Sequence, residues 1–425
     1  MEGQAELCPC LNNKEMESNI VIFGKEIIDE AAIEQLRTCT GEGDYGVLTA
    51  DAHVGYAHPI GGAIAYRDHI SISGVGFDIA CGNKAIRTDI KHEQLGSVAS
   101  LMDEIQRVIS FGIGRVNNEK VDHPVIEKIS KININTTRSE KSRLYQKAQD
   151  QLGTVGSGNH FVDIFRDDNG YIWIGVHFGS RGFGHGITTG FLSVARGGKF
   201  EERVPDGGMF SEPVLLDAGS EAGQDYIQCL KVAGEYAYAG RDWVVDRVLK
   251  ILGDPKVTFE VHNHHNFAWE EEHFGESYWV VRKGCTPAFP GQRGFIGANM
   301  FDTSVVVEGV ESEESASGLY STVHGAGRVM SRRKATGKYR YKRDDDGVKR
   351  KVQIKPGVVD FKETLARAKE LGVELRGGGA DESPQCYKKL KHVLAYQGKT
   401  VKVLHELHPI GVAMAGDDIY DPYKD

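Results

Sequence analysis

The chain has 425 residues, of which 40% are hydrophobic and 26% are charged, so it can bury a large core and is far from a disordered composition. Asp and Glu number 60 against 51 Lys and Arg, which gives a formal net charge of −9 and excludes a strongly basic nucleic-acid coat protein. The length alone, at roughly 150 residues per domain, suggests two or three domains.

The hydrophobic pattern predicts both strands and helices, read from alternation, from unbroken apolar runs and from helical spacing. In chain order we expect a strand at 69–73, a helix at 95–108, a buried strand at 171–178, a long helix from about Ser220 to Leu252, a strand at 256–262 and a helix that starts after Asp360 and ends at Gly372. Because strands and helices do not alternate regularly, we expect an α+β fold rather than a doubly wound sheet.

Residues 331–355 form the one concentrated basic stretch, with 11 Lys and Arg interleaved with Tyr339 and Tyr341. Such a run is either a solvated hairpin or loop, or it contacts a nucleic-acid backbone and stacks bases on its aromatic rings. The residue types alone leave both interpretations open.

The sequence has no run of about 18 apolar residues, so we expect no transmembrane helix and no membrane contact. The stretch 1–19 lacks the apolar centre of a signal peptide. The seven cysteines are few, scattered and odd in number, which argues against a disulfide framework, and we expect Cys8 and Cys10 to be free thiols. These features predict a cytoplasmic protein.

Histidines carry the strongest chemical signal, because several of the 16 lie in Gly- and Asn-rich segments rather than on apolar faces. The segments are DAHVGYAHPIGG (51–62), GVGFDIACGN (74–83), GTVGSGNHFVD (153–163), VHFGSRGFGH (176–185), HNHHN (262–266) and HGAGRVMSR (324–332).

One candidate metal site is built around the D-x-x-C pair Asp78 and Cys81, which a single turn can present to the same ion. The candidate imidazoles are His160, His177 and His265, each at or just after the end of a predicted strand. A carboxylate, a thiolate and imidazoles suit a borderline transition metal rather than magnesium or calcium, and a thiolate can bridge two ions. Each histidine alone is more often a structural residue than a ligand.

Phosphate-binding motifs are weak in this sequence. It contains no P-loop and no K-x-D-G pattern of polynucleotide ligases, and GFGHGITTG (182–190) only approximates a dinucleotide-binding motif. The Gly-rich turns at 153–158 and 325–327 could offer backbone N–H groups to phosphates. His324, followed by Gly-Ala-Gly-Arg, is either a nucleophile toward phosphorus or a loop residue that caps a helix.

Taken together, these segments resemble the RtcB family of RNA ligases, in the family's order and from about Asp51 to Gly416. The resemblance implies an α+β fold in which central, mostly antiparallel sheets flanked by helices surround a buried cleft for metal and nucleotide. It also implies a single catalytic domain over 1–425, with a basic loop or hairpin insertion at 331–356.

The activity that the resemblance implies is the joining of RNA with a 3′-phosphate or 2′,3′-cyclic phosphate to RNA with a 5′-hydroxyl. GTP is the co-substrate, and two Mn²⁺ are the metals, with Zn²⁺ or Co²⁺ as possible substitutes. Asp78 and His160 would hold the first ion, His177 and His265 the second, and the Cys81 thiolate would bridge them. The sequence indicates no particular protein partner.

For the nucleotide, the resemblance implies that His324 is guanylylated and that Asp51 helps the phosphoryl steps. The implied nucleotide-binding residues are Asn159, His160, Asp163, His265, Asn266, Gly297, Ala298, Asn299, Met300, Ser304, His324, Gly325, Ala326 and Gly327.

The chain departs from the family pattern at three places and so resembles a divergent member. Asp163 stands where members commonly have Glu, and residues 297–301 read GANMF where the family commonly reads PGSMG. The family's end carries a lysine that contacts guanine, but here Ala415 precedes Gly416 and the next lysine is Lys424.

Three hypotheses therefore compete. The first is the GTP- and manganese-dependent RNA ligase. The second is a metal-dependent nucleotidyltransferase or cyclic phosphodiesterase on RNA ends, with altered nucleotide specificity, which the 297–301 loop and the missing lysine motivate. The third is a non-catalytic RNA-binding module that uses the basic segment, and the presence of all five metal-type residues with His324 argues against it.

Overall fold

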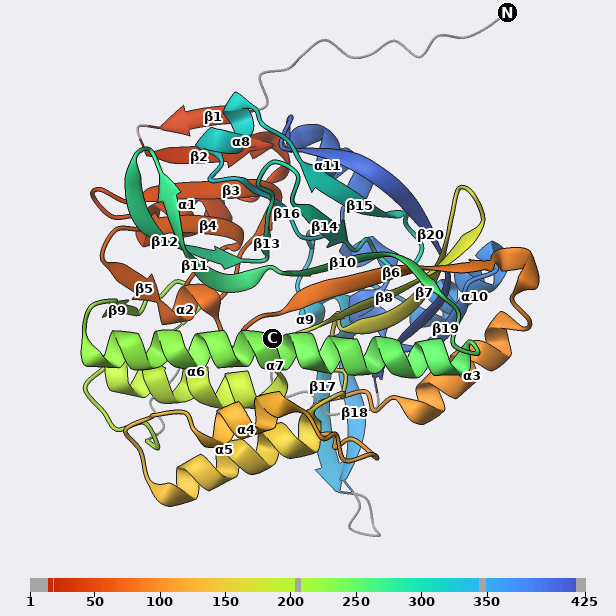
Figure 1. The fold of residues 1–425 in the computed structure, drawn as a ribbon. Helices are drawn as coiled ribbons and strands as arrows, with labels where there is room; N and C mark the ends of the chain where they lie inside the picture. Colours follow the sequence, from red (N-terminus) through yellow and green to blue (C-terminus); the bar gives the residue numbers. More distant parts are fainter. Residues whose placement is uncertain (1–13, 18, 203–207, 344–348, 418–425) are drawn as a thin grey trace, which may run out of the picture.

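The computed structural model describes residues 14–17, 19–202, 208–343 and 349–417. Cys8, Cys10 and Lys424 lie outside the described residues. Two large sheets stand side by side, and a layer of helices runs along one side of both (Figure 1). The α+β prediction with mostly antiparallel sheets is confirmed, whereas the single-domain assignment remains a prediction.

The first sheet has six strands and is antiparallel except between β2 and β3. Its order is β1 (Lys14–Glu17), β2 (Ile20–Phe23), β3 (Tyr45–His53), β4 (Ile60–Tyr66), β12 (Glu276–Lys283) and β11 (Asn266–His273).

The second sheet curls almost into a barrel. Its order is β10 (Val257–His264), β6 (Gly82–Lys91), β8 (Tyr171–Phe178), β7 (Phe161–Asp167), β20 (Val401–Gly416), β15 (Ser304–Gly309) and β14 (Arg293–Ile296), with β19 (Glu374–Gly378) parallel to β20. The end strands β10 and β14 are joined where the Phe295 N–H donates to Asn263 Oδ1 at 3.2 Å. The Asn83 amide of β6 also donates to the Phe295 carbonyl, at 2.7 Å.

Three strand pairs stand apart from these sheets. They are β5 (His69–Ser71) with β9 (Leu215–Asp217), β13 (Cys285–Pro287) with β16 (Ser321–Val323), and β17 (Gly337–Arg343) with β18 (Lys349–Pro356).

The longest described helix, α7 (Glu221–Ile251), crosses along β8, and α6 (Arg181–Ala195), α5 (Arg138–Gln151) and α4 (Pro124–Ser130) stack outside it (Figure 1). The other helices are α1 (Glu30–Cys39), α2 (Ile72–Val75), α3 (Val98–Val108), α8 (Glu313–Ser317), α9 (Arg332–Thr336), α10 (Phe361–Leu371) and α11 (Leu390–Tyr396). Short 3₁₀ turns are η1 (Lys25–Ile27), η2 (His92–Gln94), η3 (Ala380–Glu382) and η4 (Pro384–Cys386).

Apolar side chains cover both faces of the second sheet. On one face, Val162, Ile164, Ile174 and Val176 pack with α3 and α7, and on the other Trp173 and its apolar neighbours fill the interior of the curl. Successive side chains of a strand point to opposite faces, so the unbroken apolar run of β8 fits a strand that is buried on both. Among the described residues, no helix combines the length and the apolarity needed to cross a membrane.

Most of the predicted elements are confirmed, as α3, β8, α7, β10 and α10. The strand at 69–73 is wrong beyond Ser71, because the Ser71 hydroxyl accepts the Gly74 N–H and starts α2 there. The stretch 182–190 is not a nucleotide-binding loop. It lies inside α6, where its glycines allow close packing, and most of its side chains are buried.

Gly82 begins β6 and allows this strand to close on β10. A Cβ at this position would overlap with the Asn263 carbonyl and with the backbone of His264. We expect Gly82→Ala to destabilise the protein by about 1–3 kcal/mol, the usual cost of overpacking a tight site. Chemical denaturation measures it, with Gly96→Ala as the control, because a Cβ there meets nothing within 4 Å. Equal midpoints for the two variants would contradict this account.

Candidate metal and nucleotide site

Four neighbouring strands of the second sheet bring the predicted donors to one place. Asp78 and Cys81 lie in the loop before β6, His160 precedes β7, His177 lies in β8, and His265 joins β10 to β11. The strand register pairs Gly82 with both Phe178 and His264, so the chain next to Cys81 lies beside the residues next to His177 and His265.

Asp78, Cys81 and His160 form one group, with one ligand-type atom from each residue within 4.8 Å of the others. His160 Nε2 lies 2.9 Å from Asp78 Oδ2 and 3.5 Å from Cys81 Sγ. A Cβ at Gly156 would overlap with His160 Nδ1, so this ring depends on a glycine beside it. Nδ1 is buried and has no hydrogen-bond partner in the described part of the chain.

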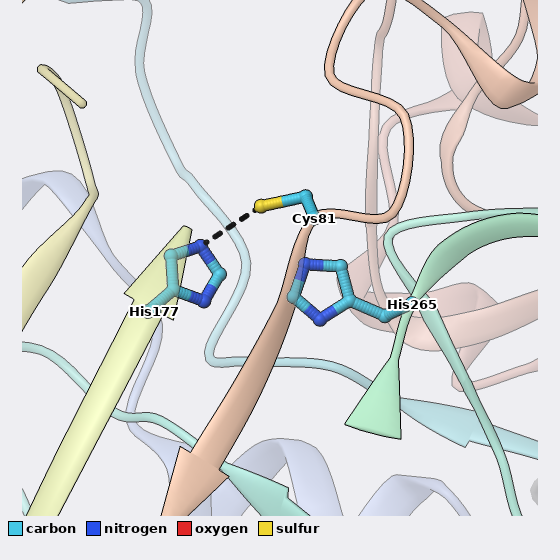
Figure 2. A group of neighbouring side chains, drawn as sticks. All are labelled: Cys81, His177 and His265. Carbon is cyan, nitrogen blue, oxygen red and sulfur yellow. Dashed lines mark hydrogen bonds between the residues drawn. The ribbon is translucent and has the colours of Figure 1, made fainter. Parts of the chain in front are cut away.

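Cys81, His177 and His265 form a second group of the same compactness, and all three residues are buried (Figure 2). His177 Nε2 lies 3.5 Å from Cys81 Sγ, and the rings of His177 and His265 are stacked with centroids 5.0 Å apart. The Nδ1 atom of His265 is also buried without a described hydrogen-bond partner. Cys81 therefore belongs to both groups.

A hydrogen bond from Nδ1, the ring nitrogen that does not face Cys81, sets the orientation of His177. Its Nδ1 lies 2.6 Å from Asn83 Oδ1, and the Asn83 amide nitrogen donates to the Phe295 carbonyl at 2.7 Å. Because that donation assigns Oδ1 as the acceptor, Nδ1 carries the proton and the lone pair of Nε2 faces Cys81. Metal-binding histidines are commonly held by a partner of this kind on the other nitrogen.

The electrostatics of the two groups favour a bound cation. Burial, followed by the charge of Asp78, raises the pKa of the Cys81 thiol well above its ordinary value, and burial lowers the pKa of His177 and His265 well below theirs. Burial also opposes the charge on Asp78, but His160 outweighs it and lowers the pKa to about 2. A metal ion makes a coordinating thiol give up its proton, and neutral imidazoles are ready ligands. The residues present therefore fit a transition metal.

Next to these groups, Asp51 organises the loop that carries His324. The carboxyl of Asp51 is fully buried, and its Oδ2 accepts the backbone N–H groups of His324 and Gly325 at 3.0 and 3.1 Å. The same oxygen lies 2.7 Å from His324 Nδ1, and Thr49 donates to Oδ1 at 2.6 Å. Burial opposes ionisation of Asp51, but the charge and hydrogen bonds of His324 lower its pKa.

The ring of His324 lies beside that of His265, with centroids 4.9 Å apart, so the candidate nucleophile adjoins the second donor group. Since Nδ1 is buried and faces the Asp51 carboxylate at ion-pair distance, the nitrogen left for chemistry is Nε2. The N–H groups of His324 and Gly325 are donated to Asp51, so they are not open to a phosphate as the glycine-rich turn suggested. Ala326 is buried and Gly327 has a φ of 71°, which favours glycine.

The altered loop at 297–304 lies against the His324 loop, because Gly297 pairs with Gly325 as an isolated bridge. Ser304 accepts the Ala298 N–H at 3.0 Å and so closes the loop on itself. Asn299 is buried, and its Nδ2 has no hydrogen-bond partner among the described residues. Met300 instead packs into the apolar cluster that contains Phe161, Trp173 and Met414.

The other residues predicted to bind the nucleotide differ in whether their side chains already form hydrogen bonds within the protein. Asn159 is exposed. Asn266 is engaged by the backbone, because its Oδ1 accepts the Gly284 N–H at 2.6 Å and its Nδ2 donates to the Asp78 carbonyl at 3.4 Å. Asp163 lies two residues from Phe161 on β7, and therefore on the same face as the ring that stacks on His177. Burial raises the Asp163 pKa well above its ordinary value, and Oδ1 has no described partner.

Ala415 lies at the end of β20 in the wall of a small polar pocket. The pocket is lined by Ser157, Gly158, Gly378, Gly379, Asp381, Glu382, Ala415 and Gly416. Its wall includes the residues just before His160, so the pocket adjoins the first donor group. The methyl side chain of Ala415 offers no donor there, whereas a lysine would.

Arg241 of α7 is a residue that the sequence analysis missed. Its fully buried guanidinium donates through Nη1 to the carbonyls of Ala80 and Phe178, at 3.0 and 2.6 Å, and its Nη2 lies 3.0 Å from His264 Nδ1. Ala80, Phe178 and His264 each adjoin a donor of the second group, namely Cys81, His177 and His265. One side chain thus ties together the three backbone segments that carry this group.

Burial lowers the pKa of Arg241 to about 10, so the group stays charged at neutral pH. An arginine in the buried stripe of a long amphipathic helix is an exception to the rule that charged groups are exposed, and that exception was the available signal.

Comparison with known proteins finds similarity over most of the chain. The family model described as tRNA-splicing ligase RtcB matches residues 33–415. The chain is 31% identical over 389 residues to the RNA-splicing ligase RtcB of Escherichia coli, covering 85% of this chain and 87% of that protein. It is 29% identical to the tRNA-splicing ligase RtcB of Archaeoglobus fulgidus, over 91% and 92% of the two chains. With the tRNA-splicing ligase RtcB of Thermococcus kodakarensis it shares 28% identity, over 87% of each chain.

The two donor groups predict metal stoichiometry. Equilibrium dialysis against Mn²⁺ or Co²⁺ after chelator treatment measures the number of bound ions. We expect two ions per wild-type chain and about one for His265→Asn. Because only Cys81 belongs to both groups, Cys81→Ser should bind both ions more weakly. The exposed His92→Asn serves as the control and should retain both ions. Unchanged binding by Cys81→Ser would show that the thiol is not a shared ligand.

Removing the Arg241 charge should loosen the second group. We expect Arg241→Met, which keeps most of the volume, to lower metal affinity about 10- to 100-fold, the usual range for outer-shell partners. It should also destabilise the fold, because two buried carbonyls lose their donor. Arg247→Met on the same helix is the matched control, since Arg247 pairs with the half-exposed Glu119. Metal competition titration and denaturation measure both effects, and equal affinities for the two variants would refute the role.

Proposed function

This chain belongs to the RtcB family of RNA-splicing ligases, and on that basis we propose that it joins RNA carrying a 3′-phosphate or 2′,3′-cyclic phosphate to RNA carrying a 5′-hydroxyl. The observation that carries the proposal is the buried Asp51–His324 pair beside two donor groups that share Cys81. A reactive imidazole next to metal donors suits phosphoryl transfer, which needs positioning and charge stabilisation more than acid–base chemistry.

Two Mn²⁺ would be held by Asp78, Cys81 and His160 and by Cys81, His177 and His265, and when bound they would offset phosphate charge. The protein's own part in the first step is the nucleophile. Asp51 holds Nδ1 of His324, so the Nε2 lone pair attacks the α-phosphorus of GTP. The N–P bond forms as the bond to pyrophosphate breaks, and the buried carboxylate stabilises the positive charge that develops on the ring.

The later steps transfer the guanylate and release it. An oxygen of the RNA 3′-phosphate attacks the guanylate phosphorus, and the N–P bond breaks to restore His324. The 5′-hydroxyl oxygen then attacks the activated 3′-phosphate, GMP leaves, and the new phosphodiester remains. A cyclic phosphate must first be opened by water to give the 3′-phosphate.

For the nucleotide itself, Asp163, Asn299 and the 324–327 loop form the proposed contacts. Asp163 and Asn299 support this assignment because each is buried with a polar atom that has no described partner. A carboxyl group and an amide can accept from and donate to the edge of a base.

The second candidate function is a nucleotidyltransferase or cyclic phosphodiesterase on RNA ends with altered nucleotide specificity. The specific observation that favours it is Ala415 in the wall of the pocket, because the methyl side chain of this residue offers no donor. The metal donors and His324 would serve either activity, so the nucleotide that labels the protein separates the two.

The direct test is covalent labelling. Metal-free protein is incubated with Mn²⁺ and α-labelled GTP, with ATP in parallel. We expect an acid-labile label from GTP that is absent in His324→Ala, persists in the control His92→Ala, and forms about 10²- to 10⁴-fold more slowly in Asp51→Asn, which keeps the shape of the side chain but loses its charge.

A label from ATP alone would mean that the altered loop has changed the base. If neither nucleotide labels a protein that has bound its metal, the ligase proposal fails and the phosphodiesterase remains, to be tested on RNA with a 2′,3′-cyclic phosphate.

A further inference from the structure

The basic segment after His324 folds into α9 and the hairpin β17–β18, which projects from the body as an arm (Figure 1). Residues 331–355 hold 11 of the 51 Lys and Arg of a chain whose net charge is −9. Its described, exposed cations are Arg333, Lys334, Lys338, Arg340 and Lys355, which we name the basic arm.

The charges of the hairpin oppose one another. The strand register places Lys338 opposite Lys355. Like charges directly across a strand pair are destabilising, and an isolated two-stranded hairpin is marginally stable in water. In the part of the chain that the structure describes, none of the five cations of the basic arm forms an ion pair with an acidic side chain. An anionic ligand would relieve this repulsion.

The root of the arm is fixed to the wall of the candidate site. Arg332, on the same short helix as Arg333 and Lys334, lies 2.9 Å from Asp381 and also pairs with Glu382. Its guanidinium lies against Gly158, two residues before His160, where a Cβ would crowd it. The N–H groups of Val358 and Val359 bond to the carbonyls of Lys334 and Ala335, which holds the returning chain to α9.

We propose that the basic arm binds the phosphate backbone of the single-stranded RNA that extends from an end bound at the site. This inference rests on the proposed function, which supplies RNA as the substrate. The arm combines cations that form no ion pair among the described residues with a fixed position beside the pocket next to His160, and it concentrates positive charge on a protein that is acidic overall. It adds affinity for the strand and takes no part in the chemistry at His324.

The test measures RNA binding separately from catalysis. Fluorescence anisotropy with a labelled single-stranded RNA bearing a 3′-phosphate is recorded without GTP at several salt concentrations. The arm variant is Lys338→Gln, Arg340→Gln, Lys355→Gln. The control is Lys128→Gln, Lys131→Gln, Lys402→Gln, which removes the same charge from three cations outside the arm that pair with glutamates.

We expect the arm variant to bind RNA about 10-fold or more weakly than the control and to lower the slope of log K against log salt by about 2, since each single-strand phosphate contact contributes about 0.7. In ligation, the KM for RNA should rise by a similar factor, while the rate of His324 labelling by GTP stays unchanged.

Equal affinity and equal salt slope for the two triple variants would overturn the proposal and leave the arm as a solvated hairpin. If only self-association in sedimentation velocity changed, the arm would be a protein-binding surface and the proposal would also fail. Absence of RNA binding by the wild type overturns it as well. Because labelling of His324 is measured without RNA, failure of the arm is distinguishable from failure of the ligase mechanism.

Discussion

The constraint on which this structure depends is the burial of a thiol, a carboxylate and three imidazoles within a few ångströms of one another. Such a cluster loses hydration without gaining full hydrogen bonding, and two of its imidazole nitrogens have no described partner. Burial raises the pKa of the Cys81 thiol and lowers the pKa of His177 and His265, which favours the neutral form of each of these three groups. The cluster therefore suits a bound cation, which would offset the cost of burying these groups.

The surrounding fold holds this cluster in place by close backbone approach and by a buried cation. Gly82 allows β6 to meet β10, and Gly156 leaves room for the His160 ring. Arg241 also binds the carbonyls of Ala80 and Phe178. These contacts act on the chain beside the donors, so small changes in them shift ligand atoms without removing any.

Charged residues in two parts of the molecule, at Asp51 and in the basic arm, have different roles. The buried Asp51 holds the loop that carries His324 with three contacts from one oxygen. The basic arm carries exposed cations, two of which, Lys338 and Lys355, lie opposite each other across the hairpin. In the proposed function the first arrangement serves bond making and breaking, and the second serves affinity for a polyanion, which explains how an acidic protein can act on RNA.

The sequence by itself determined the fold class, the main helices and strands, and the residue types of the site, because hydrophobic periodicity and unusual histidine segments are local properties of the chain. It also pointed to His324, although it left the partner of that residue open. Only the tertiary structure decided that Asp51 uses the N–H groups of the 324–325 turn, that Asn266 is engaged by backbone, and that 182–190 is a packed helix.

Arg241 was beyond sequence reasoning for the same physical reason. Its four partners, Ala80, Phe178, His262 and His264, come from segments up to 184 residues apart in the chain. Which backbone a buried guanidinium meets depends on how β6, β8 and β10 pair. Sequence pattern and spacing show which residues a segment contains. Whether residues from distant segments meet depends on strand register and on close approaches between backbone segments, which are set only when the chain folds.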